Sequence, residues 1–371
     1  MHDEGNILIM MSYDRVMTAL SHNNPDRPPV DYIATLEMNE KLKRYINIED
    51  QEELLDYLGV DMHYVNAHFI GPEEFVKEPY ICSGIRYSDI GKDFWGIERR
   101  SIKNKFGTYD EITYHPLAHV KTLKEVEEYR WPDMSWFDMS HLKKEINYIN
   151  EKERHAIIFF AGSVFETSWY MRGFEQFLMD LVECPEIAVA IVKKVTEFYK
   201  DRAMCAIEAS DGQIDIIRSG GDLGAQGGMI LSPELWRKYI KQWSRELIKP
   251  FKEMGLGTFY HSCGSIVPVI EDFIEMGLDI LDPIQPEAKG MDPEHLKDNF
   301  GSRLSFHGGI DEQKILPRGT TKDVEEEVLK LINILGNNGG YIVAPSNAVQ
   351  PDTPVENVLA MFRTAREYKY S

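Results

Sequence analysis

The sequence has no long apolar run, few cysteines and too few basic residues to balance its acidic ones. No stretch approaches the ~18 consecutive apolar residues that a membrane helix requires, and residues 1–16 do not have the pattern of a signal peptide. The four cysteines, Cys82, Cys184, Cys205 and Cys263, show no disulfide-type spacing. The net charge of -20 disfavours binding to nucleic acid or to an anionic membrane. We therefore expect a cytoplasmic globular protein.

What recurs along the chain is an alternation of short apolar runs with amphipathic helical stretches. Eight runs have the composition of buried parallel strands: Pro29–Ile33, Met62–Asn66, Ala156–Ala161, Ile214–Arg218, Thr258–His261, Asp279–Asp282, Leu304–Phe306 and Tyr341–Ala344. Helix-start signals precede Leu235–Met254 and open Thr320–Leu335. Eight strand–helix units predict an α/β protein, a single (β/α)8 TIM barrel formed by one domain over residues 1–371.

One segment in the N-terminal third interrupts this alternation. Residues 85–110 contain aromatic and turn residues and lack helical periodicity. They predict an inserted β-hairpin near the mouth of the barrel. The alternative is a solvated excursion that has no role in the site.

Polar side chains follow most of the predicted strands. In a barrel these positions gather at the C-terminal rim, where active sites are built. The candidates for catalysis are Asp222, Glu166 and His307, and the candidates for substrate binding are Gln226, Gln285 and Asn347. Structural roles are the alternatives: a loop-ordering carboxylate for Asp222, a salt bridge to Arg172 for Glu166, and a hydrogen-bonded rim residue for His307.

The most specific rim motif is Tyr-His-Ser-Cys-Gly-Ser at residues 260–265. In extended backbone, side chains two residues apart point to the same side, so His261 and Cys263 can converge on one ion. Nitrogen and sulfur form a zinc-type donor pair, and Gly264 allows a sharp turn afterwards. A metal site needs a further ligand from another strand end. The alternative is a hydrogen-bonded histidine beside a buried thiol.

Several segments together resemble the uroporphyrinogen decarboxylase superfamily. They are DRPPV at residues 26–30, SPELWRKYIKQW at 232–243, the stretch from YHSCGS to DNFG at 260–301, FHGGIDEQKILPRGT at 306–320, and GGYIVAPSNAVQPDTPVENVLAMF at 339–362. The likeness runs from about residue 12 to the C-terminus. It implies a (β/α)8 barrel with its pocket at the C-terminal rim, and dimers are common in that family.

Within that superfamily the sequence is more similar to the corrinoid-dependent methyltransferases than to the true decarboxylases. The decarboxylases carry an arginine pair after the first strand to grip a polycarboxylate, whereas this chain has Glu37 in that region. The methyltransferases bind zinc through His-x-Cys, which His261 and Cys263 match, and through a cysteine after the eighth strand. Asn347 stands at that third position, so the remaining donor would be His307, Glu166 or Asp222.

The resemblance therefore implies a zinc-assisted methyltransferase, such as a component of an O-demethylase system. It would move a methyl group between the cobalamin of a corrinoid partner protein and a small-molecule donor or acceptor. One alternative is a metal-independent decarboxylase (a lyase) acting on a different acid. A second is a binding protein that has kept the barrel and lost the catalytic site.

Overall fold

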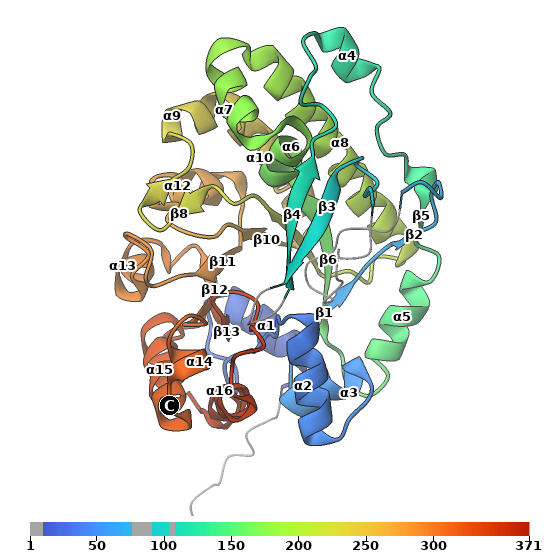
Figure 1. The fold of residues 1–371 in the computed structure, drawn as a ribbon. Coiled ribbons are helices and arrows are strands. Elements are labelled where there is room, and N and C mark those ends of the chain that lie inside the picture. Colours follow the sequence, from blue (N-terminus) through green and yellow to red (C-terminus); the bar gives the residue numbers. More distant parts are fainter. Residues whose placement is uncertain (1–9, 76–90, 104–107, 371) are drawn as a thin grey trace, which may run out of the picture.

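The computed structural model describes residues 10–75, 91–103 and 108–370. Its centre is a curled sheet of seven parallel strands in the order β1-β6-β7-β10-β11-β12-β13 (Figure 1). The strands are β1 (Met62–Val65), β6 (Ala156–Ser163), β7 (Ile216–Gly220), β10 (Gly257–His261), β11 (Ile280–Ile284), β12 (Ser305–Ile310) and β13 (Tyr341–Pro345). These seven fall where the sequence predicts strands, and their parallel pairing confirms the α/β class.

The predicted first strand, Pro29–Ile33, forms isolated contacts and no regular strand. Val30 makes a parallel bridge to Val343 of β13, and its carbonyl oxygen accepts a hydrogen bond from the backbone N–H of Asp61, just before β1. The proline that opens the segment has no N–H to donate, so it cannot extend a ladder of hydrogen bonds. The sheet therefore has seven strands where eight were predicted, and this segment lies between its first and last strands.

Most of the helices lie on the outside of the sheet, whereas α1 lies against its inner side (Figure 1). The helices are α1 (Ser12–Leu20), α2 (Leu36–Ile46), α3 (Gln51–Leu58), α4 (Leu123–Glu127), α5 (Leu142–Ile149), α6 (Val164–Arg172), α7 (Phe174–Glu183), α8 (Pro185–Ala209), α9 (Pro233–Tyr239), α10 (Lys241–Glu246), α11 (Lys249–Glu253), α12 (Val267–Met276), α13 (Pro293–Phe300), α14 (Ile315–Arg318), α15 (Thr321–Leu335) and α16 (Val355–Glu367), with a 3-10 turn at Met134–Trp136. Within the described part of the chain, none of them is long and apolar enough to cross a membrane.

The helix predictions are confirmed in part. α15 begins at a capping box formed by Thr320 and Asp323, as its sequence indicates. The predicted helix Leu235–Met254 is divided into the three short helices α9, α10 and α11. Pro250 explains the break before α11, because it lacks the N–H that a continuous helix would use at this point.

The segment between β1 and β6 carries the small antiparallel elements. β3 (Glu98–Lys103) pairs antiparallel with β4 (Thr108–Tyr114); β3 lies within the predicted range 85–110, and β4 begins in it and continues four residues beyond it. Part of that range, and Cys82, lie outside the described residues. The side chain of Arg99 lies over the ring of Tyr170 in α6, which places β3 against this helix (Figure 1).

Two further two-stranded ribbons complete the fold. β2 (His68–Phe69) pairs with β5 (Phe137–Asp138), and β8 (Gly224–Ala225) pairs with β9 (Gly228–Met229). None of these four short strands was predicted. The second ribbon directly follows Asp222, so it belongs to the rim where polar residues gather.

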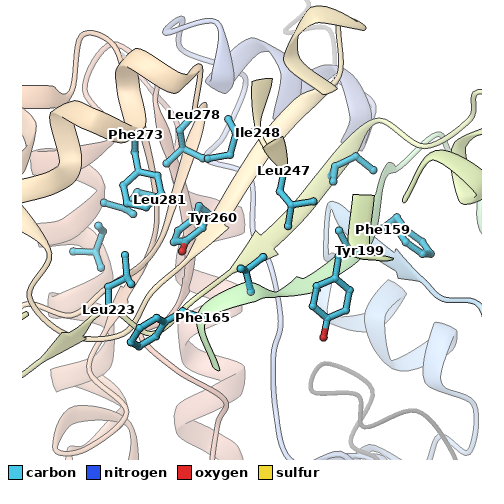
Figure 2. Packing of buried hydrophobic residues seen from close by; sticks show 14 of the residues in the cluster. Phe159, Phe165, Tyr199, Leu223, Leu247, Ile248, Tyr260, Phe273, Leu278 and Leu281 are labelled. Carbon is cyan, nitrogen blue, oxygen red and sulfur yellow. The ribbon is translucent and has the colours of Figure 1, made fainter. Parts of the chain in front are cut away.

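The main hydrophobic core fills the space between the sheet and its helices. Tyr260 of β10 packs against Phe273 of α12 with ring centroids 4.3 Å apart, and both side chains are buried. Figure 2 shows this part of the layer, with Phe159 and Tyr199 marking its continuation toward β6 and α8. The large aromatic side chains fill the space between the helices and the sheet.

The inner face of the curled sheet is layered. Its lower layer is apolar and packs against Val16 of α1: Met62, Ala156, Ile158, Ile216, Phe259, Ile280 and Ile342. Two residues after Ile216, Phe259 and Ile280, on the same face, stand Arg218, His261 and Asp282, and His307 of β12 contacts Asp282 there. The sheet therefore carries a charged layer directly above an apolar floor, on the side where the strands end.

Candidate metal centre

Three potential metal ligands come together where β7 and β10 end. His261 is the last residue of β10, Cys263 follows two residues later, and Asp222 follows β7. The Sγ atom of Cys263 lies 3.6 Å from Nε2 of His261, and that nitrogen lies 3.4 Å from Oδ1 of Asp222. The three ligand atoms all lie within 4.8 Å of one another. The i, i+2 spacing of His261 and Cys263 therefore has the convergent geometry that the sequence predicted.

The spacing of these atoms fits a zinc ion. Zinc bonds to nitrogen, oxygen and sulfur are about 2.0–2.3 Å long, so neighbouring ligands in a tetrahedral site lie about 3.3–3.8 Å apart. The two distances from Nε2 of His261, 3.6 Å to sulfur and 3.4 Å to oxygen, fall in this range. Three protein ligands leave the fourth tetrahedral position for a substrate atom, which is the pattern of catalytic zinc sites. The donor set is one nitrogen, one sulfur and one oxygen.

The loop that carries Cys263 is held by backbone contacts. Gly264 has a φ of +76°, and a Cβ atom there would lie 2.5 Å from the backbone carbon of Gly224, so glycine is required. The backbone N–H of Cys263 donates to Oδ1 of Asp222 at 2.8 Å. The backbone N–H of Ser265 donates to the carbonyl oxygen of Ala225 at 3.0 Å. The β8–β9 ribbon and the Cys263 loop therefore hold each other in place.

The three predicted substrate-binding residues occupy different positions. The amide of Gln285 accepts from the N–H of Gly264 at 2.7 Å and donates to the carbonyl oxygen of Ser346 at 3.2 Å, so it links two rim loops. Asn347 is exposed, and its Nδ2 atom lies 3.5 Å from Sγ of Cys263. Gln226 is exposed in the β8–β9 turn and is not part of the three-ligand group. Asn347 is the one of these three beside the sulfur.

His307 does not follow its strand, and that prediction of its position is wrong. β12 continues to Ile310, which places His307 inside the sheet with no exposed surface. The cause is that the run of Gly308, Gly309 and Ile310 continues the parallel pairing with β13. His307 therefore lies in the charged layer below the ligand group.

Asp282 connects this charged layer to the ligand group. Its Oδ2 atom lies 2.6 Å from Nδ1 of His261 and 2.6 Å from a terminal nitrogen of Arg218. Its Oδ1 atom lies 2.6 Å from Nδ1 of His307. A carboxylate bound to Nδ1 leaves Nε2 of His261 directed at the sulfur, as in carboxylate–histidine–zinc arrangements.

The charges around Asp282 shift the pKa values of the groups that it binds. Burial would raise the pKa of Asp282, but Arg218, His307 and His261 together hold it well below its usual value. Burial would lower the pKa of His307, but Asp282 and Asp31 raise it to about 9. Burial raises the pKa of the Cys263 thiol, and His261 offsets only part of this effect. A bound cation would favour the thiolate at Cys263.

Glu166 is a buried carboxyl group beside Asp222. It lies in the first turn of α6 and is 7% exposed, and its Oε2 atom has no hydrogen-bond partner among the described residues. Burial, and then the negative charge of Asp222, raise its pKa to about 8. The alternative role in a salt bridge with Arg172 is not observed, because Arg172 binds Asp180 at 2.6 Å. Without a bound metal, burial and Asp222 therefore favour the protonated form of Glu166 at the edge of the ligand group.

The Glu166→Gln variant is expected to be more stable than the wild type above neutral pH. The folded protein holds this proton to about pH 8, whereas an unfolded glutamate releases it near its ordinary pKa of 4.5. Wild-type stability therefore falls as the pH rises from about 4.5 to 8, and the variant lacks that loss, which is on the order of a few kcal/mol. Urea unfolding at pH 5 and pH 8 measures the difference. Exposed Glu175→Gln is the control; an equal pH response of Glu166→Gln and wild type would contradict the expectation.

Sequence reasoning missed Arg218 of the charged layer and two residues that contact this layer, Asp31 and Tyr64. Arg218 was the end of a predicted strand, and Asp31 lay in one, but neither was assigned a role. Asp31 accepts from the Tyr64 hydroxyl at 2.7 Å and lies 3.0 Å from Nε2 of His307. The alternation of side chains between the two faces of a strand could have identified Arg218. It stands two residues after an inward-facing isoleucine of the same strand, so it also faces inward.

The protein is therefore an α/β protein with a curled parallel sheet, and a group of nitrogen, sulfur and oxygen ligands lies where two of its strands end. The family model for uroporphyrinogen decarboxylase (URO-D) matches residues 108–368, and the chain belongs to this family. The proteins that resemble this chain include both a methyltransferase and decarboxylases.

The chain is similar to curated proteins of both kinds. Methylcobamide:CoM methyltransferase MtbA from Methanosarcina acetivorans is 22% identical over 257 residues, which are 68% of this chain and 70% of that protein. Uroporphyrinogen decarboxylase from Chlamydia trachomatis is 20% identical over 349 residues, 92% of this chain and 94% of that protein. A solved methyltransferase from Methanosarcina mazei has a TM-score of 0.70 at 17% identity, covering 96% of this chain and 99% of that one. At that identity the structural likeness shows a shared fold alone.

Proposed function

We propose that this protein is a methyltransferase component that moves a methyl group between the cobalamin of a corrinoid protein and a small-molecule donor or acceptor. Zinc would be held by Asp222, His261 and Cys263. The observation that carries the proposal is the convergence of their three ligand atoms within 4.8 Å, with the two distances from Nε2 of His261 in the range of a zinc tetrahedron. The similarity to MtbA and the fold shared with a solved methyltransferase support it.

The candidate residues divide the work of such a reaction. Zinc, when bound, would lower the pKa of a substrate thiol or polarise the heteroatom that carries the methyl group. Asp282 orients His261 through Nδ1. Glu166, held neutral by burial, is placed to donate a proton to a substrate heteroatom at the edge of the site. Asn347, exposed beside the sulfur, is placed to contact the substrate.

The barrel would serve as the frame for this chemistry. In this proposal the segment at residues 29–33 completes an eightfold (β/α) barrel by bridging β13 and the residues before β1. A closed barrel would bring all strand ends to one mouth, where the corrinoid of the partner could approach the ligand group. The β3–β4 pair, which packs against α6, would border that mouth.

A metal-independent decarboxylase is the second candidate, supported by the similarity to uroporphyrinogen decarboxylases. Such an enzyme needs cationic groups that are free to bind substrate carboxylates. Arg218, which lies closest in the chain to the ligand group, already binds Asp282 at 2.6 Å and is 4% exposed. This pairing favours methyl transfer over the decarboxylation of a polycarboxylate.

Elemental analysis combined with an activity assay tests the proposal. The protein purified without chelator is expected to contain about one zinc per chain, and Cys263→Ala is expected to lose it. Cys205→Ala, which changes a partly exposed cysteine of α8, is the matched control and should keep the metal. Wild-type protein with zinc should transfer methyl groups between methylcobalamin and a panel of thiols, methyl ethers and methylamines. Zinc-free protein that releases CO2 from carboxylic acids and transfers no methyl groups would contradict the proposal.

A further inference from the structure

His307 is a fully buried histidine whose two ring nitrogens both face carboxylates. Its Nδ1 atom lies 2.6 Å from Oδ1 of Asp282, and its Nε2 atom lies 3.0 Å from Oδ2 of Asp31. His307 and Asp31 have no exposed surface, and Asp282 is 2% exposed. The ring also packs against Phe259 of the apolar floor, with centroids 5.1 Å apart. Water therefore has little access to this arrangement.

The other partners of the two carboxylates are all hydrogen-bond donors. Asp282 binds Arg218 at 2.6 Å. Asp31 accepts hydrogen bonds from the Tyr64 hydroxyl and from the backbone N–H of Tyr32, at 2.7 and 2.8 Å. An imidazole that faces two acceptors has to donate from both nitrogens, and is then a cation. His307 then donates to both Asp282 and Asp31, and Arg218 donates to Asp282.

These hydrogen bonds matter for the orientation of His261. Asp282 uses one oxygen for His307 and the other for Nδ1 of His261, so its carboxylate plane is fixed from both sides. The ring of His261 then directs Nε2 at the sulfur of Cys263. Without His307, Asp282 would keep a buried oxygen with no donor, and rotation of its carboxylate would release the ring of His261.

We propose that His307 is a positioning residue of the metal site: a buried imidazolium that, between Asp31 and Asp282, locks the carboxylate that aims His261 at the ligand position. This inference rests on the proposed function, because it assigns a part in holding the metal that the same site would bind. It replaces the predicted role of His307 in direct proton transfer. His307 would act through Asp282 and would touch neither metal nor substrate.

The test measures zinc affinity in His307→Gln by competition with a chromophoric chelator. Partners of metal-ligating histidines typically contribute 10- to 100-fold to metal affinity, so a loss of about tenfold or more is expected. The matched control is His63→Gln. His63 of β1 is 2% exposed and binds Glu52 at 2.8 Å, away from the charged layer. Its loss should reduce stability and leave zinc affinity unchanged. Cobalt-substituted His307→Gln should also show an altered visible spectrum, which a loss of stability alone would not produce.

A second variant covers the case in which His307→Gln does not fold. Asp31→Asn keeps the shape of the site and removes one of the two anions that face His307, so a smaller loss of zinc affinity is expected. Nitrogen-15 NMR of histidine-labelled, metal-free wild type should show both ring nitrogens of His307 protonated at pH 7. A neutral His307, or zinc affinity and cobalt spectra unchanged in both variants, would overturn the inference.

The inference and the proposed function can fail separately. Wild-type protein that binds no zinc would remove the proposed function. Crystal structures of wild type and His307→Gln would still decide the role of His307. A His261 ring rotated away from Cys263 only in the variant would support positioning, and a ring that keeps the 3.6 Å approach to the sulfur would overturn it.

Discussion

Asp222→Ala is expected to weaken zinc binding by about a hundredfold or more, the largest effect of any single substitution outside the His261–Cys263 pair. Asp222 supplies the oxygen of the ligand group, 3.4 Å from Nε2 of His261, and also holds the Cys263 loop through a backbone N–H. The loss of an outer partner alone typically costs 10- to 100-fold, and a direct ligand should cost more. Chelator competition at constant pH measures the change.

A substitution at Asn347 should compensate for the loss of Asp222. Nδ2 of Asn347 lies 3.5 Å from the Cys263 sulfur, so a cysteine at residue 347 should place a second sulfur within reach of the same ion. Asp222→Ala combined with Asn347→Cys is expected to recover most of the zinc affinity and to intensify the thiolate-to-cobalt absorption of the cobalt form. Asn347→Ala alone is the control and should change affinity little. The assignment of Asp222 would be wrong if its alanine variant kept full affinity while Asn347→Ala lost it.

Asp61→Asn is expected to destabilise the fold by about 3–5 kcal/mol, the cost of removing one member of a buried ion-pair network. Asp61 has no exposed surface and binds Arg15 at 2.6 Å and Arg27 at 2.7 Å. It also accepts from the backbone N–H of Val30 at 2.8 Å, which ties the segment at residues 29–33 to the start of β1. The variant leaves two cations with one fewer anion and weakens this junction. Urea unfolding followed by circular dichroism measures the loss.

The matched control is an aspartate whose ion pair is exposed. Asp211 binds Lys143 at 2.8 Å with 73% of its side chain exposed, so Asp211→Asn should leave the unfolding midpoint unchanged. Equal effects of the two substitutions would show that the network at Asp61 contributes no more than a surface pair.

The sheet could be predicted from the sequence because its strands are short, apolar and regularly spaced. Those signals do not report hydrogen bonding, which is why Pro29–Ile33 was predicted to be a regular strand although its opening proline cannot donate to a ladder. The helix Leu235–Met254 was predicted as continuous because its amphipathic pattern runs through Pro250. The apolar and amphipathic patterns of the sequence thus predicted which helices and strands exist more reliably than the residues at which they end.

The candidate site was predictable where it depended on local spacing. His261 and Cys263 are two residues apart on one strand end, and extended geometry is sufficient to bring them together. The charged layer was not predictable in the same way. Asp31 and His307 are 276 residues apart in the chain, and they come to 3.0 Å because residues 29–33 lie between β13 and the residues before β1. The buried position of His307 likewise depended on how far β12 continues.

The residues of the charged layer and the residues of the ligand group differ in how easily they can be replaced. Arg218, Asp282 and His307 are supplied by strands, whose register is set by many backbone hydrogen bonds and by the apolar floor beneath. Asp222, Cys263 and Asn347 are supplied by the loops that follow the strands. Substitutions in the loops can therefore change the donor atoms and their neighbours, while the charged layer on the strands stays unchanged. For protein engineering, this offers one scaffold on which several ligand sets could be installed and compared.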